Sequence, residues 1–185
     1  MDRLLSVSLV LVLFLTLSCQ GGDPPLLWYE FESSADSVTE AGTGRREPIK
    51  GVYRYTEGVY GQALVWDGQT TEISCQAADV PKFREAVTLD AWIAPQTYSW
   101  NWTGIVCQRE TSASGEHHDG CADRLFLGIN DEGRIGFRLN LDGKVHRCLT
   151  EEAVDLLKWV YIAATYDAQG GMKLYIDGKK KKKKK

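Results

Sequence analysis

The chain has 185 residues, of which 43% are hydrophobic, 10% aromatic and 25% charged, with 18 Gly and 5 Pro. This composition excludes a collagen-like chain, a coiled coil and a disordered polypeptide, and it predicts one packed domain. The formal net charge is -3, but seven of the 22 basic residues form the terminal run Lys179–Lys185, so the rest of the chain is strongly acidic. An acidic body without a basic stripe argues against nucleic acid as a partner, because binding to phosphates depends on cations.

The N-terminal residues have the pattern of an export signal. The run Leu4–Leu17 contains only apolar residues, Ser and Thr, and it follows the single Arg3. It is too short to span comfortably the hydrocarbon core of a bilayer, which is about 30 Å thick. A short apolar run behind a basic residue is typical of a secretory signal peptide. We therefore interpret residues 1–18 as a signal peptide and residues 19–25 as a polar linker, with a buried N-terminal helix as the alternative.

Cys19 follows small residues that suit a cleavage site. Thr16 and Ser18 stand where signal peptidase requires small side chains, so that Cys19 becomes the first residue of the mature chain. This arrangement resembles the lipobox of a bacterial lipoprotein, in which the cysteine carries a lipid. Lipidation of Cys19 and plain secretion stay open as alternatives. In both, we expect the chain in the cell envelope or outside the cell, with contact to a membrane only through a lipid anchor.

From Leu26 onwards, apolar and polar residues alternate between turn residues, which is typical of antiparallel strands. Val87–Ile93 and Arg134–Asn140 each place their apolar residues on one face, whereas Trp159–Tyr166 is apolar on both faces and is expected at the centre of a sheet. Turn sequences of the hairpin type separate the runs, among them Asp67-Gly68, Asp142-Gly143, Gly170-Gly171 and Asp177-Gly178. Short strands, many turns and almost no helix predict an all-β fold, a two-sheet antiparallel jelly-roll sandwich.

The lysine run Lys179–Lys185 is unsuited to packing. Lysines cannot be buried without partners, and a block of like charges repels itself, so we expect this tail to be disordered. An adenine homopolymer misread as lysine codons, or an abrupt truncation, is the alternative origin. An anionic membrane surface is the partner that such a run could contact.

Apart from Cys19, the chain holds an even set of four cysteines. In an exported chain an even set predicts disulfides, here with three conceivable connectivities. Cys107 and Cys121 flank a polar loop between two strand-like runs, so closing this loop is the simplest pairing, and it leaves Cys75 to pair with Cys148. Buried thiols are the alternative.

Five segments in a fixed order resemble the LamG-like, concanavalin A-like jelly-roll family of secreted bacterial proteins. They are Leu27–Phe31, Gly58–Gly68, Val87–Pro95 with its central Trp92, Trp159–Asp167 and Lys173–Gly178. The resemblance covers residues 26–178 and implies a single jelly-roll domain. The strands that the family carries after Asp177-Gly178 are replaced by lysines, so the resemblance also implies a sandwich without its final strands.

The family includes glycosidases, whose activity depends on paired carboxylates. Retaining hydrolysis needs two carboxyl groups about 5 Å apart, and Glu30 and Glu32 lie two residues apart on one face of the first strand. No further acidic residue completes the family's catalytic motif, and a solvated surface pair is the simpler interpretation. We expect no catalytic residues, and a glycoside hydrolase or lyase using Glu30 and Glu32 is the alternative function.

Two segments hold residue types that ligate metals. Glu116, His117, His118 and Asp119 share one loop, but neighbouring side chains diverge and do not have the spacing of a zinc site. The resemblance implies calcium as the better candidate, because Asp36 stands where the family's calcium loop begins. Here that loop is degraded and the terminal ligands are missing, which favours an ordinary turn. We therefore expect no resident cofactor, with calcium at Asp36 as the candidate metal.

Three aromatic residues, Tyr98, Trp100 and Trp102, lie within five positions just beyond Pro95. Exposed aromatic side chains stack on sugar faces or anchor a protein partner, whereas packing over the sandwich edge is the structural alternative. We predict a non-catalytic extracellular binding or adhesion module that contacts carbohydrate or a cell-surface protein through this loop. An accessory structural domain of a larger protein is a third hypothesis.

Overall fold

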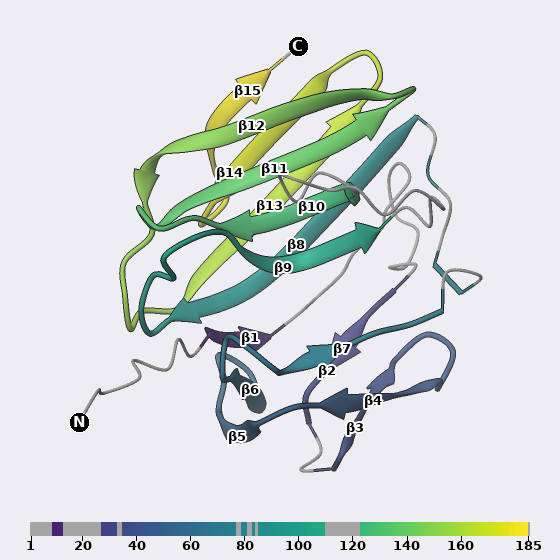
Figure 1. Ribbon diagram of the computed structural model, residues 1–185, viewed down its shortest axis with the longest axis vertical. Helices are drawn as coiled ribbons and strands as arrows, with labels where there is room; N and C mark the ends of the chain where they lie inside the picture. The colour runs from purple at the N-terminus through teal and green to yellow at the C-terminus, as the bar shows by residue number, and fades with distance from the viewer. Residues whose placement is uncertain are drawn as a thin grey trace.

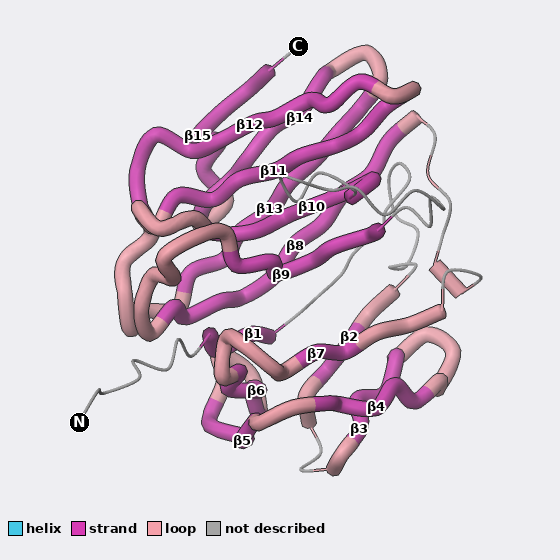
Figure 2. The backbone as a smooth tube through the Cα atoms, in the orientation of Figure 1, coloured by secondary structure: helices cyan, strands magenta, loops and turns pink. Residues whose placement is uncertain are grey.

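The computed structural model describes residues 9–12, 27–32, 35–76, 79–80, 83, 85–109 and 123–184. Within these ranges every regular element is a β-strand (Figures 1 and 2). No helix in this described part of the chain is long and apolar enough to cross a membrane. The all-β fold expected from the sequence is therefore confirmed.

The largest sheet has seven strands, all paired antiparallel. Its order is β15 (Lys179–Lys184), β14 (Gly171–Ile176), β13 (Val160–Asp167), β8 (Ala86–Pro95), β1 (Leu9–Val12), β6 (Gln62–Trp66) and β5 (Tyr53–Glu57). The apolar strand β13 lies between β14 and β8, in the interior of the sheet as the sequence predicted. A strand with neighbours on both sides presents no open edge, which agrees with its apolar residues on both faces.

A second sheet has four strands and lies in front of β8, β13 and β14 in Figure 1. Its order is β12 (Lys144–Ala153), β11 (Arg134–Leu141), β10 (Asp123–Ile129) and β9 (Thr103–Arg109). All pairs are antiparallel neighbours in sequence, so each strand is joined to the next by a local connection. The two stacked layers form the sandwich.

A smaller sheet lies beside the sandwich, in the lower part of Figure 1. Its order is β2 (Tyr29–Glu30), β3 (Ser37–Glu40), β4 (Arg46–Lys50) and β7 (Glu72–Ile73). These strands have only two to five residues. Nevertheless Tyr29, Val38 and Ile49 belong to the same buried cluster as the sandwich interior, so the smaller sheet shares the main core.

The core arises from the alternation seen in the sequence. On β11, Ile135, Phe137 and Leu139 are at most 1% exposed and face the other layer. The inward residues of β8, from Val87 to Ile93, are equally buried. Burying one such side chain stabilises the fold by about 1.5–3 kcal/mol relative to leaving it in water. The turn residues also match the prediction: Asp142-Gly143 and Asp177-Gly178 both have positive φ at the two positions, as type I′ hairpin turns require.

The lysine tail is not disordered, contrary to the prediction. Lys179–Lys184 forms β15, because the Asp177-Gly178 turn reverses the chain and aligns it antiparallel to β14. Acidic side chains on β12 neutralise part of its charge: Lys181 Nζ lies 2.7 Å from a Glu152 carboxylate oxygen, and Lys182 Nζ lies 2.7 Å from one of Glu151. The self-repulsion that composition predicts is thus offset by a partner strand from the other layer.

The predicted signal peptide contributes a strand. Leu9–Val12 forms β1, between β6 and β8, and not a helix. Whether residues 1–18 are removed stays a prediction, and the lipidation site Cys19 and the linker 19–25 lie outside the described residues.

Candidate ligand-binding surface

The aromatic loop connects the two layers of the sandwich. Residues 96–102 leave β8 after Pro95 and lead into β9 at Thr103. Short polar contacts give the loop a defined shape: the Trp102 N–H donates to Asn101 Oδ1 at 2.8 Å, and the Thr103 hydroxyl donates to Ser99 Oγ at 2.8 Å. Such local side-chain bonds stabilise an irregular backbone. The loop therefore presents its side chains from a fixed frame.

Tyr98 anchors this loop to the sandwich. Its side chain is half-buried, and its hydroxyl donates to the backbone carbonyl of Val154. Its ring lies on Gly133, where an added Cβ would collide with the ring carbons. Leu157 N–H also donates to the Pro95 carbonyl at 2.8 Å, which ties the start of the loop to the segment before β13. Tyr98 thus positions the loop, and the sequence prediction that it contacts ligand has no support from this geometry.

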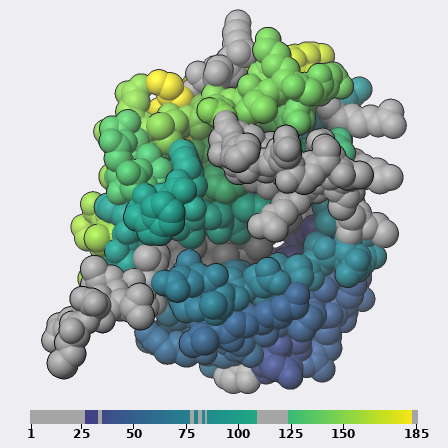
Figure 3. All heavy atoms as spheres, viewed as in Figure 1, coloured from purple at the N-terminus to yellow at the C-terminus, as the bar shows by residue number. Residues whose placement is uncertain are grey.

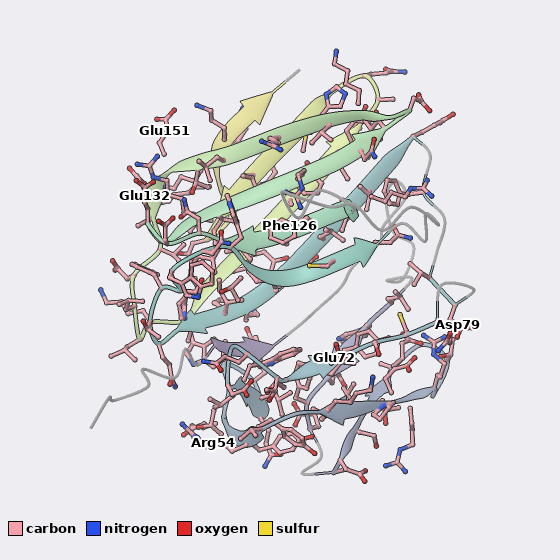
Figure 4. All side chains as sticks on the ribbon, viewed as in Figure 1. Arg54, Glu72, Asp79, Phe126, Glu132 and Glu151 are labelled. Carbon is pink, nitrogen blue, oxygen red and sulfur yellow. The ribbon has the colours of Figure 1, made fainter. Side chains whose placement is uncertain are left out.

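The Trp102 ring lies against the outer face of the β9–β12 sheet, over Gly136. A Cβ at Gly136 on β11 would collide with the Trp102 ring, so the absence of a side chain there makes room for the indole. The ring meets Phe126 edge to face, with centroids 5.7 Å apart and planes at 82°. On the other side, the Arg138 guanidinium lies 4.8 Å from the Phe126 centroid. We call Trp102, Phe126 and Arg138 the aromatic platform, and Figure 4 shows Phe126 on the near face of β10.

Three glycines leave room on the sheet for the rings of this platform. Gly104, Gly128 and Gly136 are opposite one another in the registers of β9, β10 and β11, and they form a row across the sheet. An added Cβ at Gly128 would collide with the Phe126 ring, as one at Gly136 would with Trp102. The row therefore forms a shallow trough that holds two aromatic rings against the backbone. Sequence reasoning missed it, because glycines in different strands become neighbours only through the register.

Trp100 is more exposed than the other two aromatic residues of the loop. It is 89% exposed, whereas Trp102 is 45% exposed. Figure 3 shows the teal surface from the middle of the chain on the near face, beside the green surface of later residues. Leaving most of an indole in water forfeits the stabilisation that burial gives. A fully exposed Trp next to a half-exposed one is typical of a contact surface.

The carboxylates singled out from the sequence lie elsewhere. Glu30 and Glu32 are both exposed and flank the buried Phe31 on β2 and just beyond it, in the smaller sheet. The Glu32 carboxylate lies against Gly61, where an added Cβ would collide with it. The two side chains share one face, as predicted, but this face belongs to the smaller sheet and not to the sheet that carries the platform.

A carboxylate that the sequence analysis overlooked is fully buried. Glu40 is 0% exposed and accepts hydrogen bonds from the Trp28 N–H at 3.0 Å, the Gly42 N–H at 3.0 Å and both the N–H and the hydroxyl of Thr43 at 2.8 and 2.6 Å. Burial by itself would raise the pKa of Glu40, but these hydrogen bonds outweigh it and lower the pKa below its ordinary value. Glu40 is a structural clamp on the loop between β3 and β4.

The metal candidates receive no support. Within the described ranges, no three His, Cys, Asp or Glu side chains gather into a group that could hold a metal ion. Asp36 is exposed, and its backbone carbonyl accepts the Ile49 N–H at 2.8 Å, which continues the pairing of β3 with β4 by one residue. Calcium at Asp36 therefore stays a prediction without further ligands in this part of the chain. The zinc candidates, residues 116–119, lie outside the described residues.

The structure does not show the predicted disulfide between Cys75 and Cys148. Cys75 follows β7 in the smaller sheet, whereas Cys148 is buried on β12, opposite Phe137 in the β11 register. Two cysteines that are left over in sequence need not meet in space. Burial, and then the Glu47 charge, raise the pKa of the Cys75 thiol. Cys121 lies outside the described residues, so the pairing of Cys107 with Cys121 stays a prediction.

A family comparison agrees with this architecture. Residues 67–185 match the family Laminin_G_3, described as the concanavalin A-like lectin/glucanases superfamily. The matched range includes all strands of the β9–β12 sheet and the aromatic platform on it. No curated protein and no solved structure matches the chain significantly.

Proposed function

Since the chain belongs to the concanavalin A-like lectin/glucanase superfamily, we propose that it is a non-catalytic binding module that holds carbohydrate against the Trp100 loop. The match to this superfamily of lectins and glucanases supports a lectin-like or carbohydrate-binding module. The aromatic loop and the aromatic platform together form the surface to which we assign this role.

The exposure of Trp100 is the observation that carries the proposal. Its indole is 89% exposed, and Trp102, which belongs to the platform, follows it two residues later in the same loop. The apolar C–H face of a sugar ring stacks on such aromatic surfaces, while its hydroxyl groups need polar partners nearby. Arg138, whose guanidinium lies over the Phe126 ring, brings a side chain with hydrogen-bond donors into the platform. Because Tyr98 already fixes the loop, a ligand need not order it, and less affinity is lost on binding.

The module acts outside the cell in this proposal. The support is the apolar run Leu4–Leu17 and the small residues before Cys19. Mass spectrometry of the exported chain tests this point. A chain that begins at Cys19, with or without the mass of an acyl group, supports export, and a retained Met1 contradicts it.

Binding to immobilised polysaccharides tests the function directly. The full chain is applied to β-glucan, xylan, galactan and chitin, and Trp100→Ala is compared with Tyr60→Ala. Tyr60 is the matched control, because it is 66% exposed on a different segment, between β5 and β6. We expect Trp100→Ala to weaken retention at least tenfold, about 1.4 kcal/mol, and Tyr60→Ala to leave it unchanged. Equal effects of the two variants, or retention on none of the four polysaccharides, contradict the proposal.

Hydrolysis is the second candidate, because Glu30 and Glu32 share one exposed face. The same polysaccharides are incubated with the chain, and new reducing ends are measured. A release of reducing ends that disappears in the Glu30→Gln, Glu32→Gln double variant would replace the binding-only proposal with a glycosidase. No release, or release that persists in the double variant, leaves these carboxylates without a catalytic role.

A further inference from the structure

The position of β1 in the large sheet is unusual. Leu9–Val12 pairs antiparallel with β6 on one side, from Leu9 opposite Trp66 to Leu11 opposite Leu64. On the other side it pairs antiparallel with β8, from Leu9 opposite Pro95 to Val12 opposite Trp92. Strands β6 and β8 therefore run parallel to each other, and among the described strands no backbone pairing joins them directly. Four residues link the β5–β6 hairpin to the rest of the sheet.

Both faces of the strands beside β1 are apolar. On one face, Leu64 and Ile93 belong to the main core and are 0% exposed. On the other, Ala63, Val65 and Ala94 form a separate buried cluster, with Trp92 and Trp159 packed against it. This second cluster combines residues of β6 and β8, which β1 separates. A strand that lies between apolar neighbours on both faces must itself be apolar throughout, as the sequence Leu-Val-Leu-Val is.

The segment that fills this position lies within the expected leader, residues 1–18. Its removal would leave β6 and β8 with facing rows of backbone N–H and C=O groups that lack partners. Such rows are templates for another strand, and each unpaired buried group is costly. The sheet would not stay open at this point for long.

We propose that the gap between β6 and β8 is a strand-acceptor site for an extended apolar segment of another polypeptide, which the leader occupies in the unprocessed chain. Binding by strand addition takes affinity from main-chain hydrogen bonds and specificity from alternate side chains. The acceptor requires a segment of about four residues that runs antiparallel to both neighbours. Proline is excluded at its centre, because both edges of the segment donate and accept hydrogen bonds.

Availability of the site rests on the export proposed above, since the leader must be removed first. The test is independent of export and of carbohydrate binding. The full chain is made by cell-free synthesis without membranes, so that the leader stays attached and folding occurs with it. A protease recognition sequence replaces residues 20–24, and the folded chain is then cut there.

A fluorescent peptide of residues 7–14 with added terminal lysines for solubility is the probe. It is present during and after cutting, and its binding is followed by anisotropy. We expect the probe to exchange into the site and to bind at least tenfold more tightly than a matched peptide with Val10→Pro and Leu11→Pro. Hydrogen exchange at residues 63–66 and 92–94 should accelerate on loss of the leader and slow again with the probe.

Four results overturn the proposal. One is that neither the leader fragment nor the probe associates with the cut chain while its tryptophan fluorescence stays native. Another is that the proline peptide binds as well as the probe, since strand addition cannot explain that. A third is dimerisation of the cut chain with exclusion of the probe, which would make a second copy the occupant. If the chain unfolds on cutting, the probe must prevent it, and failure to do so also overturns the proposal. The Trp100→Ala comparison is made on uncut chain, so its outcome is unaffected.

Discussion

The β9–β12 sheet and the smaller β2–β3–β4–β7 sheet both have four antiparallel strands, but they are stabilised differently. The first has strands of seven to ten residues, whose backbone ladders and buried side chains distribute stability over the whole sheet. The second has strands of two to five residues, too short for long ladders. Its loops depend instead on individual carboxylates that accept several backbone N–H groups.

Glu40 and Asp67 are the two carboxylates of this kind. Glu40 holds the loop after β3, and Asp67 accepts the N–H groups of Gln69, Thr70 and Thr71 in the loop between β6 and β7. Burial alone would raise the pKa of Asp67, but its hydrogen bonds outweigh burial and lower the pKa far below the ordinary value. The comparison teaches that a sheet with long backbone ladders does not need the side chains of its outer face for stability, so that this face can bind a ligand. A sheet with short strands concentrates its stability in a few side chains.

Loss of the Glu40 charge is expected to have the largest effect. Glu40→Gln removes a charged acceptor from four hydrogen bonds and leaves its donors without full partners, at a cost of about 2–4 kcal/mol. Urea unfolding measures it, with the exposed Glu57→Gln as the matched control, expected within about 0.5 kcal/mol. Because the folded pKa of Glu40 is lowered, its contribution is complete above pH 4.5 and is lost as the pH falls through the folded pKa. Equal stability of the two variants would mean that the short strands are stable without the hydrogen bonds of the Glu40 carboxylate.

Filling the glycine row should have the next largest effect. In Gly136→Ala the new Cβ meets the Trp102 ring, which must leave its place on the sheet. We expect a loss of about 1–3 kcal/mol, typical of overpacking, and stronger quenching of tryptophan fluorescence by iodide. Gly170→Ala is the control, because the nearest atom there is the end of the Lys173 side chain, which can move. Unchanged quenching in Gly136→Ala would contradict the platform.

Alkaline pH should weaken the sandwich through Tyr161 on the outer face of the seven-stranded sheet. Burial, and then the nearby Asp90, raise the pKa of Tyr161 to about 12. A raised folded pKa favours the neutral phenol, so its contribution is complete below pH 10 and is lost between pH 10 and 12. Unfolding midpoints across this window should fall less in Tyr161→Phe than in the unaltered chain. Parallel curves for the two proteins would exclude Tyr161 as the cause.

The smallest effect is expected at the lysine strand. Glu151→Gln removes the ion pair with Lys182, but both groups are solvated, and exposed pairs contribute little. We expect no measurable change in the unfolding midpoint at physiological salt. A clear loss would show that charge pairing, and not the β14 ladder, holds β15 in place.

Sequence patterns predicted the elements whose signals are local. Alternation over Val87–Ile93 and Arg134–Asn140 identified strands, and Asp142-Gly143 and Asp177-Gly178 identified hairpin turns. The sequence also identified the aromatic loop, but it did not show that Tyr98 anchors the loop while Trp100 is left exposed. Tyr98 became an anchor because Gly133 and Val154 come to lie beside it, thirty-five or more residues later in the chain. No local pattern contains that information.

Elements that need a distant partner were missed or misjudged. β15 forms because the Asp177-Gly178 turn aligns the lysines antiparallel to β14, and Glu151 and Glu152 on another sheet offset part of their charge, while composition alone predicts disorder. The structure does not show the Cys75–Cys148 pair, and chain order says nothing about the distance between two cysteines. The burial of Glu40 depends on the backbone of Trp28, twelve residues away, whose N–H its carboxylate accepts.

By itself, the sequence determined that this protein is an all-β sandwich, because side chains that alternate with a period of two can be buried only on one face of a strand. It also determined where the chain turns, since Asp-Gly pairs accept the positive φ that tight hairpins require. The tertiary structure alone decided which faces meet. It aligned Gly104, Gly128 and Gly136 into one trough, left Trp100 in solvent and placed Leu9–Val12 between β6 and β8. Register and strand order are set by long-range pairing, whose free energy belongs to no single segment.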